Sequence, residues 1–99
     1  MTPSFPFIAH KFGGSSMRDA ERIAQVAAIL STREGERQVV VVSAMQGVTD
    51  ALIALAHSAA ARSEVWRDAL GRLRERHQAT ALALLGAQAE ATVAWLEQE

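Results

Sequence analysis

The 99-residue sequence predicts an α/β fold, in which a strand–helix–strand unit begins a three-layer domain with a parallel sheet and a helical segment follows. Three observations predict it. A short apolar run ends at Gly13-Gly14, a continuous valine run covers residues 39–42, and an amphipathic helical pattern separates the two. Two consecutive strands joined by a helix are expected to be parallel, with a right-handed crossover.

The first strand is predicted over residues 6–12, which are partly aromatic and β-branched. The helix after it is expected to be capped by Ser15 or Ser16, since Ser16 and Asp19 have the spacing of a capping box. It should end shortly before the Glu-Gly-Glu turn at residues 34–36. Its apolar stripe comprises Ala20, Ile23, Ala24, Val26, Ala27, Ile29 and Leu30.

The valine run predicts a second strand that is covered on both faces, as strands of parallel sheets are. Because two strands alone do not form a stable sheet, we interpret residues 1–99 as the N-terminal part of one incomplete domain. Within it, residues 5–62 form a βαβα core that carries the two loops described below. Residues 63–99 form a helical segment.

Three helices are predicted after the second strand, at residues 50–62, 63–85 and 87–99, with Gly86 as a break. Ser63 is expected to cap the second of them. The inner side of the first should comprise Leu52, Ile53, Leu55 and Ala56. The stripe of the second should comprise Trp66, Leu70, Leu73, His77, Ala81 and Leu84.

The composition excludes several classes of function. A net charge of -1 gives no indication of nucleic-acid or anionic-membrane binding, and the absence of cysteine excludes disulfides and thiolate chemistry. Residues 1–6 lack the features of a signal peptide, and no apolar run has membrane-spanning length, so a cytoplasmic location is expected. No histidines have metal-ligand spacing, and no metal-binding residues are predicted.

The first loop whose residues suit ligand binding is Lys11-Phe12-Gly13-Gly14-Ser15-Ser16. Glycines allow backbone amides to approach a ligand closely, and a helix N-terminus adds amides and partial positive charge, which together suit a phosphate. Lys11, the single lysine of the chain, would add a full charge. The spacing differs from Walker A and from Gly-x-Gly-x-x-Gly. The alternative is a plain strand–turn–helix connection without a ligand.

The second loop covers residues 43–49, after the second strand, and should open at the same edge of the sheet as the first. The hydroxyls of Ser43 and Thr49 and the amides near Ala44 and Gly47 suit a small carboxylate or amino acid. Alternatively, Thr49 only caps the next helix and Ser43 only ends a strand.

Other polar residues give weaker indications. His10 could point to the core or toward a nucleotide, while His77 has the placement of a satisfied core or interface histidine. The charged run at residues 72–76 is interpreted as a solvated helix face.

Both loops resemble motifs of aspartate kinases, which are members of the amino-acid kinase fold family. Residues 11–16 resemble the opening motif of that family, and Val41-Val42-Ser43-Ala44-Met45-Gln46-Gly47-Val48-Thr49-Asp50 resembles its second motif. The separation of the two motifs also matches. The helical stretch after Arg62 resembles forms with an extended helical insert, including lysine-sensitive forms and forms fused to homoserine dehydrogenase or diaminopimelate decarboxylase.

The resemblance implies an ATP-dependent transfer of a phosphoryl group to the β-carboxylate of L-aspartate, giving 4-phospho-L-aspartate for lysine, threonine and methionine biosynthesis. It implies that Lys11 is catalytic and binds ATP phosphates together with Gly13, Gly14 and Ser15. Mg²⁺ would accompany the nucleotide. The aspartate site would be lined by Ser43, Ala44 and Thr49.

The resemblance also implies a homo-oligomer for the full-length protein. The Ser-x-Gly-Glu and Gly-Arg-Gly-Gly-Ser-Asp segments of the family do not occur in the 99 residues, so the isolated chain is expected to be inactive. Two alternatives are an amino-acid kinase with glutamate or acetylglutamate as acceptor, and a non-enzymatic helical binding or assembly module.

Overall fold

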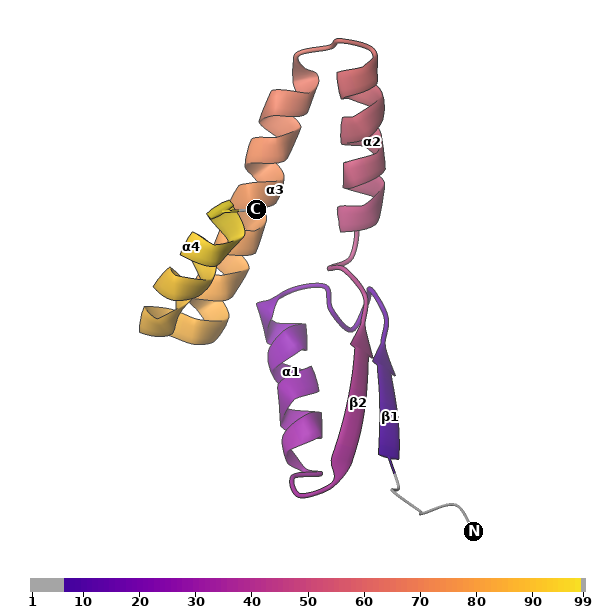
Figure 1. Cartoon of the computed structure of the whole chain (residues 1–99), viewed down its shortest axis with the longest axis vertical. Helices are drawn as coiled ribbons and strands as arrows, with labels where there is room; N and C mark the ends of the chain where they lie inside the picture. Colours follow the sequence, from indigo (N-terminus) through magenta and orange to yellow (C-terminus); the bar gives the residue numbers. More distant parts are fainter. Residues whose placement is uncertain (1–6, 99) are drawn as a thin grey trace. The chain divides into compact units, whose positions relative to one another are not determined.

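The computed structural model describes residues 7–98, without the side chains of residues 96 and 97. In chain order the elements are β1 (Phe7–Phe12), α1 (Ala20–Ser31), β2 (Arg37–Val42), α2 (Val48–Ala60), α3 (Val65–Leu85), the 3₁₀ turn η1 (Gly86–Gln88) and α4 (Ala89–Gln98) (Figure 1). The predicted α/β class, with a βαβ start followed by helices, is confirmed. The predictions for residues 1–6 and for Glu99 lie outside the described residues.

The chain divides into two compact units, a βαβ unit up to Gln46 and a helical unit from Gly47. The prediction from sequence placed a division after Arg62 instead, between the helix at 50–62 and the next one. The structure groups α2 with the helices because α2 packs against α3. A two-helix hairpin with a short connection commonly packs in this way.

The sheet of the βαβ unit consists of β1 and β2, which are parallel and in register from Phe7↔Arg37 to Phe12↔Val42. Side chains alternate along β1, so that His10 and Phe12 are half-buried while Lys11 between them is exposed. Helix α1 covers the face that carries Phe12, since Val26 of α1 and Phe12 line the same small hollow.

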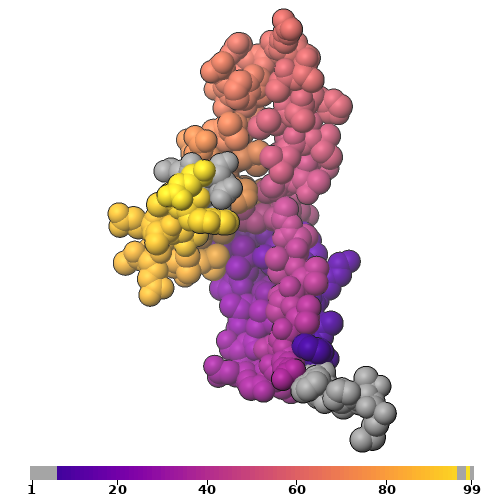
Figure 2. Space-filling view, in the orientation of Figure 1, coloured from indigo at the N-terminus to yellow at the C-terminus, as the bar shows by residue number. Residues whose placement is uncertain are grey.

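The valine run of β2 is less covered than its sequence predicts. Val39, Val40, Val41 and Val42 are 46%, 41%, 54% and 49% exposed, and β2 is open to view along its length in the space-filling picture (Figure 2). The described residues 7–98 therefore do not themselves supply the cover on both faces that the valine run predicts for a larger domain. The reason is that one helix and two strands cannot enclose a strand from both faces and both edges.

Helix α1 begins later than predicted. Its N-cap is Asp19, whose carboxylate accepts a hydrogen bond from the amide of Arg22 at 2.9 Å. The predicted caps Ser15 and Ser16 are wrong because the carbonyl of Gly13 accepts the amides of Ser16 and Met17, each at 3.1 Å, and holds the segment in a turn.

The buried side of α1 is narrower than the predicted stripe. Val26 is only 7% exposed, and Ile23 and Leu30 are half-buried, whereas Ala24 and Ala27 are exposed. Ile29, also predicted to face inward, is 48% exposed. A single sheet face one strand pair wide can cover only the central line of the helix.

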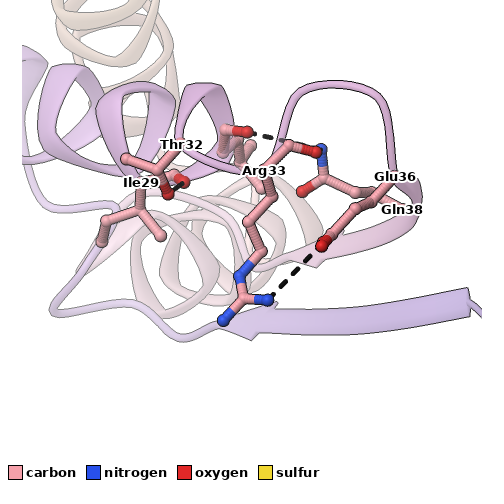
Figure 3. A network of polar contacts seen from close by, with 6 residues as sticks. Ile29, Thr32, Arg33, Glu36 and Gln38 are labelled. Carbon is pink, nitrogen blue, oxygen red and sulfur yellow. Dashed lines mark hydrogen bonds and ion pairs between the residues drawn. The ribbon is translucent and has the colours of Figure 1, made fainter.

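The connection from α1 to β2 is held by polar contacts, which Figure 3 shows from close by. The side-chain Nε2 of Gln38 donates to the carbonyl of Arg33 at 3.3 Å, and the guanidinium of Arg33 lies 3.5 Å from the carboxylate of Glu36. Gly35 has φ 93°, a backbone conformation that residues with a side chain rarely adopt. The predicted turn at 34–36 is confirmed.

In the helical unit, α3 packs against both α2 and α4. Helix α2 starts two residues earlier than predicted, and its inner side is formed by Val48, Ala51, Leu55 and Ser58. The predicted inner residues Leu52 and Ile53 are 49% and 53% exposed, and Ala56 is exposed as well. The inner stripe is therefore offset from the prediction because α2 faces α3 alone.

Helix α3 follows its prediction more closely. The N-cap of α3 is Glu64, which makes no side-chain cap hydrogen bond, so the predicted cap Ser63 is wrong. The hydroxyl of Ser63 instead accepts the amide of Val65 at 3.3 Å in the turn before the helix. Gly86 ends the helix with φ 57°, as predicted. The predicted stripe is half-buried except for Leu70, which is 37% exposed. Nδ1 of His77 lies 2.7 Å from the carbonyl of Leu73 and donates to it, so this histidine is satisfied as predicted. Among residues 7–98, the helices are all too short or too polar to cross a bilayer.

Candidate nucleotide and substrate site

The candidate site starts where the two strands end. The amide of Ser43 donates to the carbonyl of Phe12 at 3.0 Å, which extends the strand pairing one residue beyond β2. Because parallel strands have their carboxyl ends at one edge, Gly13 and Ser43 both leave the sheet there. The prediction that the two loops leave the same edge is confirmed for residues 13–15 and 43–46.

The glycine loop is a turn rather than the first turn of a helix. The carbonyl of Gly13 accepts the amides of Ser16 and Met17, and the amide of Met17 is also 3.1 Å from the carbonyl of Gly14. Within the described part of the chain, the amides of Gly13, Gly14 and Ser15 donate no backbone hydrogen bond. Three consecutive amides are thus available to an anion, and they belong to the turn, not to the N-terminus of α1 as predicted.

The two loops lie against each other at Gly14. A Cβ atom built on Gly14 would lie 3.7 Å from the Cα of Gln46 and 3.8 Å from the Oγ of Ser43. These are ordinary van der Waals distances, so the hydrogen of the glycine leaves a narrow gap between the loops. The sequence did not indicate Gln46 as a neighbour of the glycine loop, because the contact depends on the strand pairing.

Ser43 and Ala44 form the near end of the second loop. The hydroxyl of Ser43 donates to the carbonyl of Ala44 at 2.6 Å, which leaves its oxygen able to accept from a ligand. Ala44 is exposed, while Met45 is only 8% exposed and fixes the loop by packing. The Ser43 oxygen therefore lies in a segment that is fixed by the hydrogen bond of the Ser43 amide to Phe12 on one side and by the buried Met45 on the other.

Lys11 and His10 lie on opposite faces of β1. Lys11 pairs in register with Val41 and is exposed on the face away from Phe12. The ring of His10 stacks on Phe12 at a centroid distance of 6.0 Å, and its Nε2 is buried without a hydrogen-bond partner among the described residues. Of the two orientations left open for His10, the structure has the one toward the covered face.

Thr49 belongs to the helical unit and is the second residue of α2, where its side chain is exposed. The N-cap of α2 is Gly47, with φ 86° and no side-chain hydrogen bond. Thr49 is therefore inside the first turn, and the alternative interpretation of Thr49 as the cap is wrong.

The residues of the βαβ unit fit an anionic phosphate ligand. Three unbonded amides and the close approach at Gly14 are features of phosphate-binding loops, and Lys11 supplies positive charge at the end of the preceding strand. A protein-held metal fits less well, because no group of three His, Asp or Glu side chains among the described residues could hold one. Mg²⁺ held mainly by nucleotide phosphates needs no such cluster.

Comparison with known proteins identifies the class to which this loop arrangement belongs. The model of the amino acid kinase family matches residues 6–98. The chain belongs to this family.

The relatives with curated names are aspartokinases. The chain is 46% identical over 76 residues to the chloroplastic bifunctional aspartokinase/homoserine dehydrogenase 1 of Arabidopsis thaliana, covering 77% of the chain and 8% of that protein. The corresponding protein of Daucus carota is 43% identical with the same coverage. The aspartokinase of Mycobacterium bovis is 49% identical over 51 residues, which cover 50% of the chain and 12% of that protein. The chain thus spans about a tenth of the length of these relatives.

Proposed function

We propose that this chain supplies the ATP-phosphate loop and part of the aspartate pocket of an aspartate kinase, which phosphorylates the β-carboxylate of L-aspartate. The observation that carries the proposal is the contact of the two loops at Gly14, with Ser43 and Gln46 within 3.8 Å of its Cβ position. A phosphate on the first loop and a carboxylate on the second would then be neighbours, as in-line transfer requires. Membership of the family and the names of the relatives support the same reaction.

In this proposal Lys11 is the catalytic residue and also binds the phosphates. An ammonium at about 4 Å from a phosphate oxygen contributes roughly 4 kcal/mol at an effective dielectric near 20, before desolvation is subtracted. The amides of Gly13, Gly14 and Ser15 would hold the phosphate oxygens. Phosphoryl transfer depends mainly on positioning and on charge neutralisation, and these groups supply both.

The proposed acceptor site uses the oxygen of Ser43, the backbone at Ala44 and the hydroxyl of Thr49. Mg²⁺ would enter with ATP, bound mainly by the phosphates. We further propose a role in lysine, threonine and methionine biosynthesis, a cytoplasmic location and a homo-oligomer for the full-length protein. The 99-residue chain alone is expected to give no aspartyl-hydroxamate, because the later segments of the family are absent from it.

The test is a pair of substitutions in the full-length protein that contains this chain. Lys11→Ala is expected to lower kcat/KM for aspartyl-phosphate formation about 100-fold to 1000-fold, as the loss of one charge at the transferring group does. Arg37→Ala is the matched control. Arg37 is also an exposed cation on the same face of the sheet, at the opposite end, with its guanidinium 5.9 Å from the ring centroid of Phe7.

Arg37→Ala is expected to change kcat/KM less than about threefold, since only nearby charges act strongly in water. Equal losses for the two variants would contradict the role of Lys11. The acceptor is tested with L-aspartate, L-glutamate and N-acetylglutamate under the same conditions. A preference for either glutamate compound would contradict the assignment of the second loop to aspartate.

A further inference from the structure

Gln46 lies in the second loop and has no assigned role in the proposed kinase site. Its Cα is 3.7 Å and its Cβ 4.0 Å from the Cβ position of Gly14, so the base of its side chain adjoins the glycine loop. The Gln46 side chain is exposed, and within the described part of the chain it makes no hydrogen bond or ion pair. Its carboxamide is therefore available to a ligand at the junction of the two loops.

Among residues 43–46, Gln46 is the side chain with hydrogen-bond donors to offer. The hydroxyl of Ser43 already donates to the carbonyl of Ala44 at 2.6 Å. The side chains of Ala44 and Met45 carry no N–H or O–H group. A carboxamide, in contrast, has two N–H donors and one acceptor oxygen. An anion at this end of the second loop can thus accept a side-chain hydrogen bond from Gln46.

The carboxamide of Gln46 can reach a ligand that the glycine loop holds. The amide nitrogen of Gly14 is two bonds, about 2.5 Å, from its Cβ position. An anion oxygen bound to that amide would lie about 2.9 Å from the nitrogen. The Nε2 of a glutamine is three bonds beyond Cβ, about 4 Å when the side chain is extended. Since the Cβ of Gln46 is 4.0 Å from the Cβ position of Gly14, rotation of its side chain spans the remaining distance.

The backbone of Gln46 is fixed on both sides. Met45 before it is only 8% exposed, and Gly47 after it has φ 86°, a conformation that favours glycine. The position of the Gln46 Cβ is therefore set by the loop, while its terminal carboxamide is exposed and can adjust to a ligand. Residues 13–16 and 43–46 contain no charged side chain, so no carboxylate in either segment competes with an anion for this donor.

We propose that Gln46 donates a hydrogen bond from its carboxamide to a phosphate oxygen of ATP held by the glycine loop. This inference rests on the proposed function, to which it adds a binding residue that joins the second loop to the nucleotide. Hydrogen bonds to charged oxygens are stronger than those between neutral groups, so one donor has a measurable effect. The phosphate is favoured over L-aspartate as the ligand because Gln46 adjoins Gly14 of the phosphate loop.

The test uses two substitutions of Gln46 in the full-length protein that contains this chain. Gln46→Met keeps the unbranched length of the side chain and its contact at Gly14 but removes the donor. We expect the dissociation constant of a non-hydrolysable ATP analogue with Mg²⁺, measured by isothermal titration calorimetry, to rise about tenfold. The KM for L-aspartate should change less than about threefold. Gln46→Glu should raise the dissociation constant about 100-fold, because a carboxylate repels the phosphates in addition to losing the donor.

Ala28→Glu is the matched control for charge. Ala28 is an exposed residue of α1 in the same unit, about 12 Å along the helix axis from Ala20. A carboxylate there should change the dissociation constant less than about threefold, because water and salt screen charges at such distances. Melting temperatures verify that each variant is folded.

Lys11→Ala in the same titration separates this inference from the proposed function. If Lys11→Ala weakens binding of the analogue at least tenfold while Gln46→Met binds it as the parent does, the role of Gln46 alone is overturned. If Lys11→Ala has no effect, the proposed function fails. The role of Gln46 is also overturned if Gln46→Met raises the KM for L-aspartate and leaves binding of the analogue unchanged, or if Ala28→Glu weakens binding as much as Gln46→Glu.

Discussion

The βαβ unit and the helical unit are stabilised by contacts of different range. In the first, residue 7 pairs with residue 37, and the sheet brings two loops together at Gly14. In the second, each helix packs on its neighbour in sequence. Non-local pairing thus brings the two candidate loops together, while local pairing produces a helical hairpin with an open hollow between α2 and α3. The comparison shows that a short chain can position the backbone of two loops although many of its apolar side chains stay exposed.

The largest expected effect on stability is at the small core of the βαβ unit. Val26 is 7% exposed, so Val26→Ala should reduce the free energy of unfolding of this unit by about 2 kcal/mol. Val65→Ala, at a position 61% exposed in the helical unit, should change it by less than about 0.5 kcal/mol. Urea unfolding measures both, and similar losses would show that exposure does not distinguish the two positions.

The next effect separates ligand binding from folding. Gly14→Ala adds a methyl group that meets Ser43 and Gln46 at ordinary contact distances, so thermal stability should change little. The methyl group fills the gap between the loops, and ATP affinity of the full-length protein should fall about tenfold. Isothermal titration calorimetry with an ATP analogue checks this. Unchanged affinity in a stable variant would place the nucleotide elsewhere.

Substitutions of two glycines in the helical unit should have smaller effects on stability, and the two effects should have opposite signs. Gly47 has φ 86°, so Gly47→Ala should destabilise the unit by about 1 kcal/mol. Gly71 lies inside α3, and apart from its own helix backbone no atom of the described residues lies within 4 Å of its Cβ position, so Gly71→Ala should stabilise the unit by about 0.5 kcal/mol. Melting temperatures that shift in the same direction would contradict the conformational explanation.

The smallest effect depends on pH. The hydrogen bond from the amide of Arg22 lowers the pKa of Asp19 below its ordinary value of 3.8, with Arg18 as a further cause. The charged cap therefore stabilises α1 above that pH, and the contribution is lost as the pH falls through the lowered pKa. Asp19→Asn keeps an acceptor without the charge. Its melting temperature should be slightly below that of the parent at pH 7 and converge with it on acidification.

If the difference between parent and Asp19→Asn stayed constant across that range, ionisation of the cap would not be its cause. The helical unit is the internal reference, because Asp19 lies in the βαβ unit. Amide chemical shifts in α3 should follow the same pH dependence in both proteins.

Sequence patterns predicted the elements well where local signals are strong. The apolar run that ends at Gly13-Gly14 predicted β1, the valine run predicted β2, and Gly35 and Gly86 marked the ends of α1 and α3. The predicted Ser63 cap was wrong, because Glu64 is the N-cap of α3. The start of α1 was not predictable from capping preference alone. The carbonyl of Gly13 accepts the amides of Ser16 and Met17, so residues 13–17 form a turn and not the first turn of a helix. This turn becomes evident only in three dimensions.

The sequence predicted the two loops of the candidate site, but it did not predict which of their residues lie against each other. Gly14 and Ser43 were identified from sequence, whereas their approach, and that of Gln46, follows from the register of the sheet. The ligand-binding and catalytic roles of all the site residues stay predictions, namely those of Lys11, Gly13, Gly14, Ser15, Ser43, Ala44 and Thr49. The inner side of α2 was predicted wrongly because apolar residues surround that helix, and periodicity does not determine which of them faces α3.

The half-exposed valines of β2 have a consequence for how this chain behaves among other copies of itself. Both strands of a two-stranded sheet are edges, and Arg37–Val42 is a β-branched segment with a single charge at its start. Such a segment is a template for intermolecular strand addition and cross-β assembly. Whether the chain aggregates in a cell therefore depends on relative rates. Intramolecular partners must cover β2 faster than β2 pairs with the β2 strand of a second copy.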